Sequence, residues 1–212
     1  MATTNKFSID LTRSVAWTHC ENGPLDLRPV TASDNAGYLS ASIEFEAQSF
    51  HSIPTQGESM PCWTPGYVEH ANHAVATIRA DLLAVTMVNI SVHAVHSWLI
   101  EHNIAGLVWP TIMDTQLRPA CCLTILLNRT VNAQTYQQLW LKLARDVFAE
   151  CLDPAQADSR YRFDFPRTPD DQSRLLRHDG HAFPVDYAIA LDEITSEAIA
   201  DYATTHAVYI QD

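Results

Sequence analysis

Two kinds of apolar pattern alternate between residues 67 and 165, and their order limits the folds that this chain can adopt. Residues 82–88 (LLAVTMV), 107–113 (LVWPTIM) and 120–127 (ACCLTILL) are short and nearly continuous apolar runs. Such runs are typical of strands that are buried on both faces. The segments that follow the first and third runs instead place apolar residues at helical spacing. The sequence therefore predicts a domain in which helices cover a sheet.

Each expected helix follows a side chain that commonly caps helices. Ser91 precedes the first helix, which is expected to stop near residues 103–106. Asn132 precedes the second helix, which is expected to stop before Asp153. The apolar stripes that should face the core are Val92, Val95, Leu99 and Ile100 in the first helix and Tyr136, Leu139, Leu143 and Val147 in the second.

The last element of this series is expected at residues 161–165, where aromatic and charged side chains alternate as in a half-exposed strand. The order is then strand, helix, strand, strand, helix, strand, which is the βαββαβ core of ferredoxin-like and RRM-like folds. We expect an α/β (α+β) fold with an antiparallel sheet and helices on one face. The second and third strands form a hairpin, with Pro110 at an edge or bulge. Residues 183–189 and 196–206 are expected to add a C-terminal strand and helix.

The composition of the chain changes near residue 66. Residues 18–66 are rich in Ser, Thr, Pro, Gly and Glu, whereas residues 67–165 are dense in Val, Leu and Ile. We therefore expect residues 1–66 to form an N-terminal subdomain. It would pack on a main domain of residues 67–212, whose core is residues 67–165.

Acidic residues outnumber basic ones. Thirteen Lys and Arg against 25 Asp and Glu give a formal net charge of −12 at pH 7. This charge repels nucleic acid and anionic membranes at long range, so a polyanionic partner needs a local basic patch. Nearly all the basic residues are arginines, which favour bidentate contacts with phosphate or carboxylate. Five arginines from Arg160 to Arg177 lie among aspartates, which indicates either a salt-bridged surface loop or a phosphate-contacting strip.

The cysteines and the lengths of the apolar segments indicate the cellular compartment in which this protein is expected. The five cysteines are an odd number without C-x-x-C spacing, and Cys121 and Cys122 lie within an apolar run, so we expect reduced and mostly buried thiols. Residues 1–10 lack an apolar region, and no run approaches the roughly 18 apolar residues of a membrane span. We expect a cytoplasmic protein without a membrane partner.

Few motifs for catalysis are present. The chain has neither a nucleophile elbow (G-x-S-x-G) nor a phosphate-binding loop (G-x-x-x-x-G-K). His93 and His96 share one helical face at a spacing that a metal ion can bridge, although a surface or core pair is the favoured interpretation. Asp114, Asp153 and Asp158 are candidate Mg²⁺ ligands at strand ends and loops, although turn and cap roles are favoured for each.

Four segments carry a further signal, which covers about residues 60 to 190. They are residues 63–89 (WTPGYVEHANHAVATIRADLLAVTMVN), 106–131 (GLVWPTIMDTQLRPACCLTILLNRTV), 152–166 (LDPAQADSRYRFDFP) and 179–189 (DGHAFPVDYAI). Their order and spacing resemble the catalytic domain of the archaeo-eukaryotic primase superfamily. The resemblance is greatest to the primase-polymerase domains at the N-termini of plasmid and phage replication proteins.

The resemblance implies a two-metal site for nucleotidyl transfer, with two acids at the end of the first core strand. This chain has Thr86, Val88 and Asn89 there, and their neutral side chains hold Mg²⁺ poorly. Each lost electrostatic contact can lower the rate by ~10²-fold or more. At the other family positions, Met113-Asp114 replaces a Ser-x-His histidine and Cys122 replaces an arginine, whereas Arg129, Asp153 and Ser159-Arg160 match.

The resemblance and its departures together suggest a catalytically degenerate primase-polymerase-like domain, not an enzyme and without a cofactor. It would act in mobile-element DNA replication by binding single-stranded DNA or replication proteins. Tyr161, Arg162 and Phe163 offer an exposed strand on which bases can stack. The candidate phosphate contacts are Arg118, Arg129, Arg160 and Arg162, for each of which an ion pair with a neighbouring Asp is the alternative.

Two other functions remain open. The first is an active primase-polymerase with an unorthodox Mg²⁺ or Mn²⁺ site built from Asp114, Asp153 and Asp158. The second is an acidic protein-interaction or inhibitor module of a phage or plasmid, because a net charge of −12 suits a basic partner.

Overall fold

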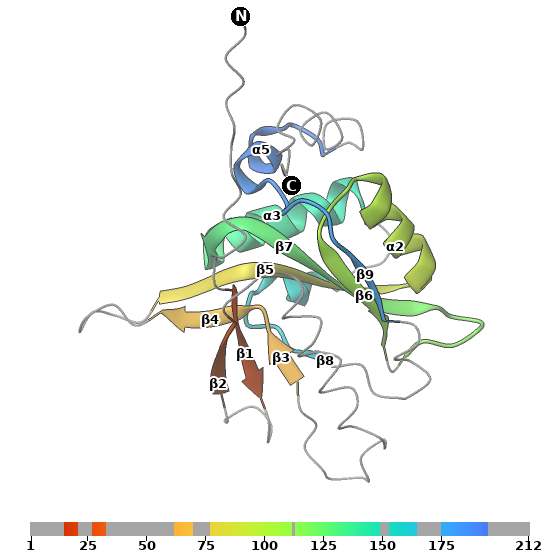
Figure 1. The fold of residues 1–212 in the computed structure, drawn as a ribbon, viewed down its shortest axis with the longest axis horizontal. Helices are drawn as coiled ribbons and strands as arrows, with labels where there is room; N and C mark the ends of the chain where they lie inside the picture. The colour runs from red at the N-terminus through yellow and green to blue at the C-terminus, as the bar shows by residue number, and fades with distance from the viewer. Residues whose placement is uncertain are drawn as a thin grey trace, which may run out of the picture.

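The structure is a computed structural model, and it describes residues 15–20, 27–32, 62–69, 77–111, 113–148, 153–164 and 175–194. Within these ranges the chain forms helices and two antiparallel sheets (Figure 1). The mixed α/β class expected from the sequence is therefore confirmed. The elements are β1 (Val15–Cys20), β2 (Leu27–Ala32), β3 (Cys62–Thr64), β4 (Gly66–Glu69), β5 (Thr77–Val88), α2 (Val92–Glu101), β6 (Gly106–Pro110), β7 (Ala120–Asn132), α3 (Ala133–Asp146), the 3-10 helix η1 (Pro154–Ala157), β8 (Phe163–Asp164), β9 (Leu176–His178) and α5 (Val185–Ala190).

The larger sheet has five strands in the order β4-β5-β7-β6-β9, and each neighbouring pair is antiparallel. The segment β5-α2-β6-β7-α3 places β7 between β5 and β6, as the first five elements of a βαββαβ core require. The expected hairpin of the second and third strands is β6 and β7. Pro110 is the last residue of β6 and lies beyond residues 106–108, which pair with β9. At this position the missing N–H of proline removes no hydrogen bond between β6 and β9.

The sixth element of the expected core lies elsewhere, and that prediction was wrong. The residues at its centre form β8, which pairs with β3 at the edge of the smaller sheet, β2-β1-β3-β8. The place beside β5 is taken by β4, which precedes β5 in the chain. Phe163 of β8 is only 1% exposed, so burial against the smaller sheet overrides the half-exposed pattern seen in the sequence.

Residue 65 alone separates β3 from β4, so the chain passes there from the smaller sheet to the larger one. The division into residues 1–66 and 67–212 itself stays a prediction. The expected C-terminal strand at residues 183–189 is wrong in its type, because α5 occupies most of it and only Phe183 makes an isolated bridge, to Leu127. The expected helix at residues 196–206 lies outside the described residues.

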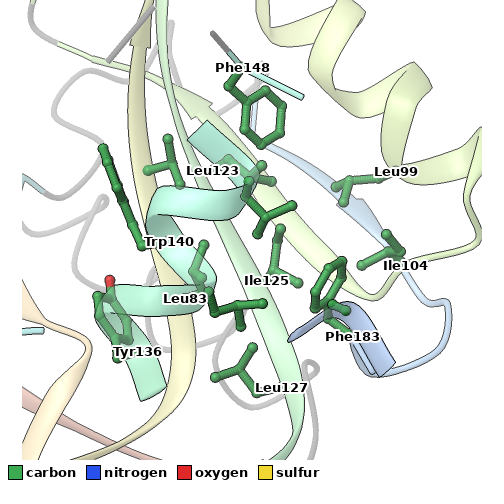
Figure 2. Packing of buried hydrophobic residues seen from close by; sticks show 14 of the residues in the cluster. Leu83, Leu99, Ile104, Leu123, Ile125, Leu127, Tyr136, Trp140, Phe148 and Phe183 are labelled. Carbon is green, nitrogen blue, oxygen red and sulfur yellow. The ribbon is translucent and has the colours of Figure 1, made fainter. Parts of the chain in front are cut away.

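The five-stranded sheet is buried on both faces, as the continuous apolar run of β5 predicted. Alternate residues of β5 point to opposite sides: Leu83 joins the core beneath the helices, whereas Leu82 joins a second cluster against the smaller sheet. Helices α2, α3 and α5 lie on one side, and β1, β2, β3 and β8 lie on the other (Figure 1). Figure 2 shows Leu83 and Ile125 among side chains from α2 and α3.

The two predicted helices are confirmed with their caps. The Ser91 side chain accepts from the Ala94 N–H at 3.2 Å, and the Asn132 side chain accepts from the Thr135 N–H at 2.8 Å. Ile100 departs from the prediction, because it is 51% exposed. The ten-residue helix α2 buries a narrow stripe, and Ile100 lies beyond it. The buried helix residues are Val92, Val95 and Leu99 in α2 and Tyr136, Leu139, Trp140 and Leu143 in α3.

Three of the five cysteines can be followed in the structure. Cys62, Cys121 and Cys122 are buried, as expected. None of the helices in the described segments is long and apolar enough to cross a membrane.

Candidate functional site

The end of β5 is where the primase resemblance would place metal-binding acids, and its outer edge is closed by side chains. Antiparallel β4 pairs with residues 77–80 of β5 only. Beyond that point, the Oε1 atom of Gln156 accepts from the Thr86 N–H at 2.6 Å, and its Nε2 atom donates to the Thr86 carbonyl at 3.2 Å. Gln156 is 3% exposed, so this amide is an internal part of the fold.

The same edge is closed at Ala84 by two side chains of α3. The Ala84 N–H donates to the Tyr136 hydroxyl at 3.4 Å, and the Trp140 indole N–H donates to the Ala84 carbonyl at 3.3 Å. Burial raises the pKa of Tyr136 well above its ordinary value, so the phenol remains neutral. These contacts occupy the space that a further strand would need for pairing.

The loop between β6 and β7 meets the other side of the end of β5. The Asp114 carboxylate accepts from the Ala120 N–H at 2.8 Å, and Ala120 pairs with Val88 in the ladder. The Asn89 N–H donates to the Pro119 carbonyl at 2.7 Å, and Asn89 adopts a φ of 62°. Short polar side chains such as that of Asn tolerate this left-handed backbone. The chain thus turns sharply where the family pattern has an acid.

Each of the three candidate acids has a local partner. Asp114 holds the Ala120 N–H, and Asp153 caps η1 by accepting from the Ala155 N–H at 3.0 Å. Asp158 forms a 2.6 Å ion pair with Arg160, and this hydrogen-bonded guanidinium holds the pKa of Asp158 below its usual range. No group of three or more His, Cys, Asp or Glu within the described ranges is placed to hold a metal ion. A metal-binding role for these acids stays a prediction.

The four candidate phosphate contacts divide into two pairs. Arg129 makes a bidentate ion pair with Asp186, with nitrogen to oxygen distances from 2.6 to 3.1 Å, and Arg160 is paired with Asp158. Arg118 and Arg162 are exposed, and neither guanidinium bonds to any residue that the structure describes. Two of the four charges are therefore neutralised within the fold, and two face solvent.

The proposed stacking strand at Tyr161, Arg162 and Phe163 is not an exposed surface. Phe163 is 1% exposed, and its ring lies 5.5 Å from that of Trp63 and 5.1 Å from that of Tyr161. These rings belong to the cluster between the two sheets, so Phe163 is unavailable for bases. Of the three residues, only Arg162 is exposed.

The histidine pair of α2 has a structural contact. A ring nitrogen of His96, Nε2, lies 3.0 Å from the Arg177 carbonyl oxygen and so joins α2 to the edge strand β9. Nearby, His178 Nε2 lies 3.2 Å from the Asn103 side-chain oxygen. Burial, and next the neighbouring His96, lower the pKa of His178. The surface interpretation of His93 agrees with its exposure.

Sequence reasoning missed two residues at this end of the sheet. Gln156 lies in a polar segment, PAQA, which gave no sign of contact with a strand about 70 positions earlier. Leu117 is 99% exposed in the β6–β7 loop. Its only signal was an apolar residue inside the polar stretch DTQLRP.

The arrangement is a closed sheet end with a projecting loop. Its edge is occupied by Gln156, Tyr136 and Trp140, and Arg118 in the projecting loop is exposed. It can hold the backbone rigidly and offer cationic contacts to a partner. Comparison with known proteins finds no matching family model, no matching curated protein and no matching solved structure.

Proposed function

We propose that this chain is a non-catalytic module with a primase-like framework that acts in mobile-element DNA replication by binding single-stranded DNA. The observation that carries the proposal is the contact of Gln156 with both backbone groups of Thr86. The primase resemblance expects metal-binding acids at the end of β5. There, the Gln156 amide occupies the outward-facing backbone groups of Thr86.

The framework supports a relationship to primases in its order of elements. The segment β5-α2-β6-β7-α3 with β7 in the centre is the arrangement that the resemblance implied. Thr86, Val88 and Asn89 offer no carboxylate at the strand end, and the nearby Asp153 is used as a cap. Nucleotidyl transfer needs acids that hold two metal ions, so these residues support the proposed loss of catalysis.

Exposed arginines support a role in binding. The guanidinium groups of Arg118 and Arg162 are exposed and bond to no residue that the structure describes, so both are available to contact phosphate. The net charge of −12 opposes association, so binding should be weak and strongly dependent on salt. Each phosphate contact adds about 0.7 to the salt slope for a single strand.

Two assays test the proposal. Fluorescence anisotropy with a labelled single-stranded oligonucleotide should show binding at ~20 mM salt that is lost by ~200 mM. The Arg162→Gln variant should weaken binding, whereas the ion-paired Arg129→Gln variant should change it less. A primer-synthesis assay with Mg²⁺ and with Mn²⁺ should yield no product. Absence of binding at the lower salt would refute DNA binding, and product that depends on Asp153 would refute loss of catalysis.

Binding of a replication protein is the second candidate, and the charge of the chain favours it. Two arginines are consumed in ion pairs, and an excess of 12 negative charges suits a basic partner. A pull-down from the native host followed by calorimetry with the purified partner would test it. A partner whose binding weakens with salt supports this candidate, and purified proteins that do not associate argue against it.

A further inference from the structure

The loop between β6 and β7 ends in a tightly closed turn. The Thr115 N–H donates to the Arg118 carbonyl at 3.0 Å, and the Arg118 N–H donates to the Thr115 carbonyl at 3.2 Å and to the Thr115 hydroxyl at 3.0 Å. The base of the loop is held by Asp114, whose carboxylate accepts from the Ala120 N–H. The tip, defined as residues 115–118, is therefore held in shape without a partner.

This tip presents an apolar side chain beside a cation. Leu117 is 99% exposed, the largest value among the exposed large apolar residues of the described chain, and Met113 is 52% exposed in the same loop. Arg118 follows directly and is exposed. Asp114, the nearest acid in the sequence, accepts from the Ala120 N–H at the base of the loop. The local charge of the tip is positive in a chain whose net charge is −12.

The exposed Leu117 at the apex of this closed turn leaves its apolar side chain open to contact. Burial of such a side chain is favourable, and here nothing in the described chain covers it. Leucine is among the apolar side chains that minor-groove binders insert between base steps of duplex DNA, and a neighbouring arginine pairs with phosphate. Apolar surface next to one positive charge complements an unstacked base next to its own phosphate.

We propose that the tip is the base-contacting element of the single-stranded DNA site, with Leu117 packed on an unpaired base and Arg118 on the adjacent phosphate. This inference rests on the proposed function, which it deepens by naming the contact. The pre-formed turn limits the entropy lost on binding, because residues 115–118 need no further ordering.

The test compares two probes with equal phosphate content. One is a thymidine oligonucleotide of about 20 nucleotides, and the other is an abasic strand of the same length, which keeps the phosphates and lacks the bases. Because packing Leu117 on a base removes apolar surface from water, the wild-type chain should bind the thymidine strand roughly 5- to 10-fold more tightly than the abasic one. Leu117→Ser should remove this preference and leave the salt slope unchanged.

The neighbouring variant gives a different signature. Arg118→Gln should weaken binding to both strands and lower the salt slope by about 0.7. Leu141→Ser, at an exposed leucine of α3 outside the tip, is the matched control and should bind both probes as the wild type does. Leu117 is exposed, so its substitution should leave the circular dichroism spectrum and the urea midpoint unchanged.

The outcomes separate the two levels of the proposal. A wild-type chain that binds neither strand at ~20 mM salt overturns the proposed function and the tip proposal with it. A wild-type chain that binds, with Leu117→Ser still preferring bases as before, overturns the tip proposal alone. That result leaves DNA binding standing and makes a protein pocket the candidate partner of Leu117.

Discussion

Gln156 holds Thr86 with both ends of its side-chain amide, at 2.6 Å to the N–H and 3.2 Å to the carbonyl. One side chain thereby replaces two hydrogen bonds of a missing neighbouring strand. Together with Tyr136 and Trp140 at Ala84, it closes the part of β5 that β4 does not cover. This closure explains how the segment β5-α2-β6-β7-α3 forms a stable sheet without a further strand beside the end of β5.

The amide of Gln156 should be needed for stability. Gln156→Ala leaves two part-buried backbone groups of Thr86 without their side-chain partner, so we expect a loss of about 2 to 4 kcal/mol in the free energy of unfolding. Urea denaturation measures it. Gln138→Ala, at an exposed position of α3, is the control and should change stability by less than about 0.5 kcal/mol. Equal effects of the two substitutions would contradict a structural role for the amide.

Tyr136 should make the fold sensitive to alkali. Its pKa is raised in the folded state by burial, so its contribution is complete below the ordinary tyrosine pKa of about 10 and declines as the pH rises above it. Tyr136→Phe should cost about 1 kcal/mol at neutral pH, because the Ala84 N–H loses its acceptor. Its stability should then fall less than that of the wild type above about pH 10. Tyr187→Phe serves as the comparison, and identical alkaline slopes for Tyr136→Phe and the wild type would speak against this assignment.

Asp146 should make the fold sensitive to acid. Its side chain is 2% exposed and bonds to Arg145 and to the Ile194 N–H, the latter at 2.7 Å. The hydrogen bond from Arg145 is the main cause that lowers the pKa of Asp146, and the Ile194 N–H adds to it. A lowered pKa gives stability that is complete above the unfolded value of about 3.9 and is lost as the pH falls through the lower folded value.

The test is the urea midpoint measured from neutral pH down to acid. Asp146→Asn should be less stable than the wild type at neutral pH and should lose less stability below about pH 4. Asp192→Asn removes the same charge from an exposed position and should keep the acid response of the wild type. A wild-type response in Asp146→Asn would show that another carboxyl group is responsible.

Phe163 should act in the core between the two sheets. Its ring packs against Trp63, and Phe163→Ala should cost about 3 to 5 kcal/mol because it opens a cavity. The neighbouring Arg162→Ala, at an exposed position, should change stability by less than about 0.5 kcal/mol. Chemical denaturation followed by tryptophan fluorescence compares the two. A stable Phe163→Ala protein with impaired DNA binding would instead restore the stacking role.

The sequence predicted the local elements well, for physical reasons visible in particular residues. Ser91 and Asn132 cap their helices because a cap needs only a side-chain oxygen that accepts from the backbone N–H three residues later. The run at residues 82–88 is buried on both faces, as its lack of alternation indicated. Ile100 was misplaced because helical periodicity does not state how wide the buried stripe is.

The candidate site was less predictable than the fold. Asp153, Asp158 and Arg160 were identified as chemically interesting, but their cap and ion pair depend on a local loop geometry. Arg129 lies 57 positions from Asp186, so no local pattern connects them. Residues 161–165 alternate aromatic and charged side chains, which is typical of a half-exposed strand. Phe163 is nevertheless buried, because its ring packs on Trp63.

By itself the sequence determined which segments are helices and strands in the centre of the chain, because caps and apolar periodicity act between residues that are near in the chain. Only the tertiary structure decided which strand borders β5 and what closes its edge. Those contacts join residues such as Thr86 and Gln156, 70 positions apart, and rival strands compete for the same backbone groups. The competition is settled by the area that each arrangement buries, which no local pattern contains.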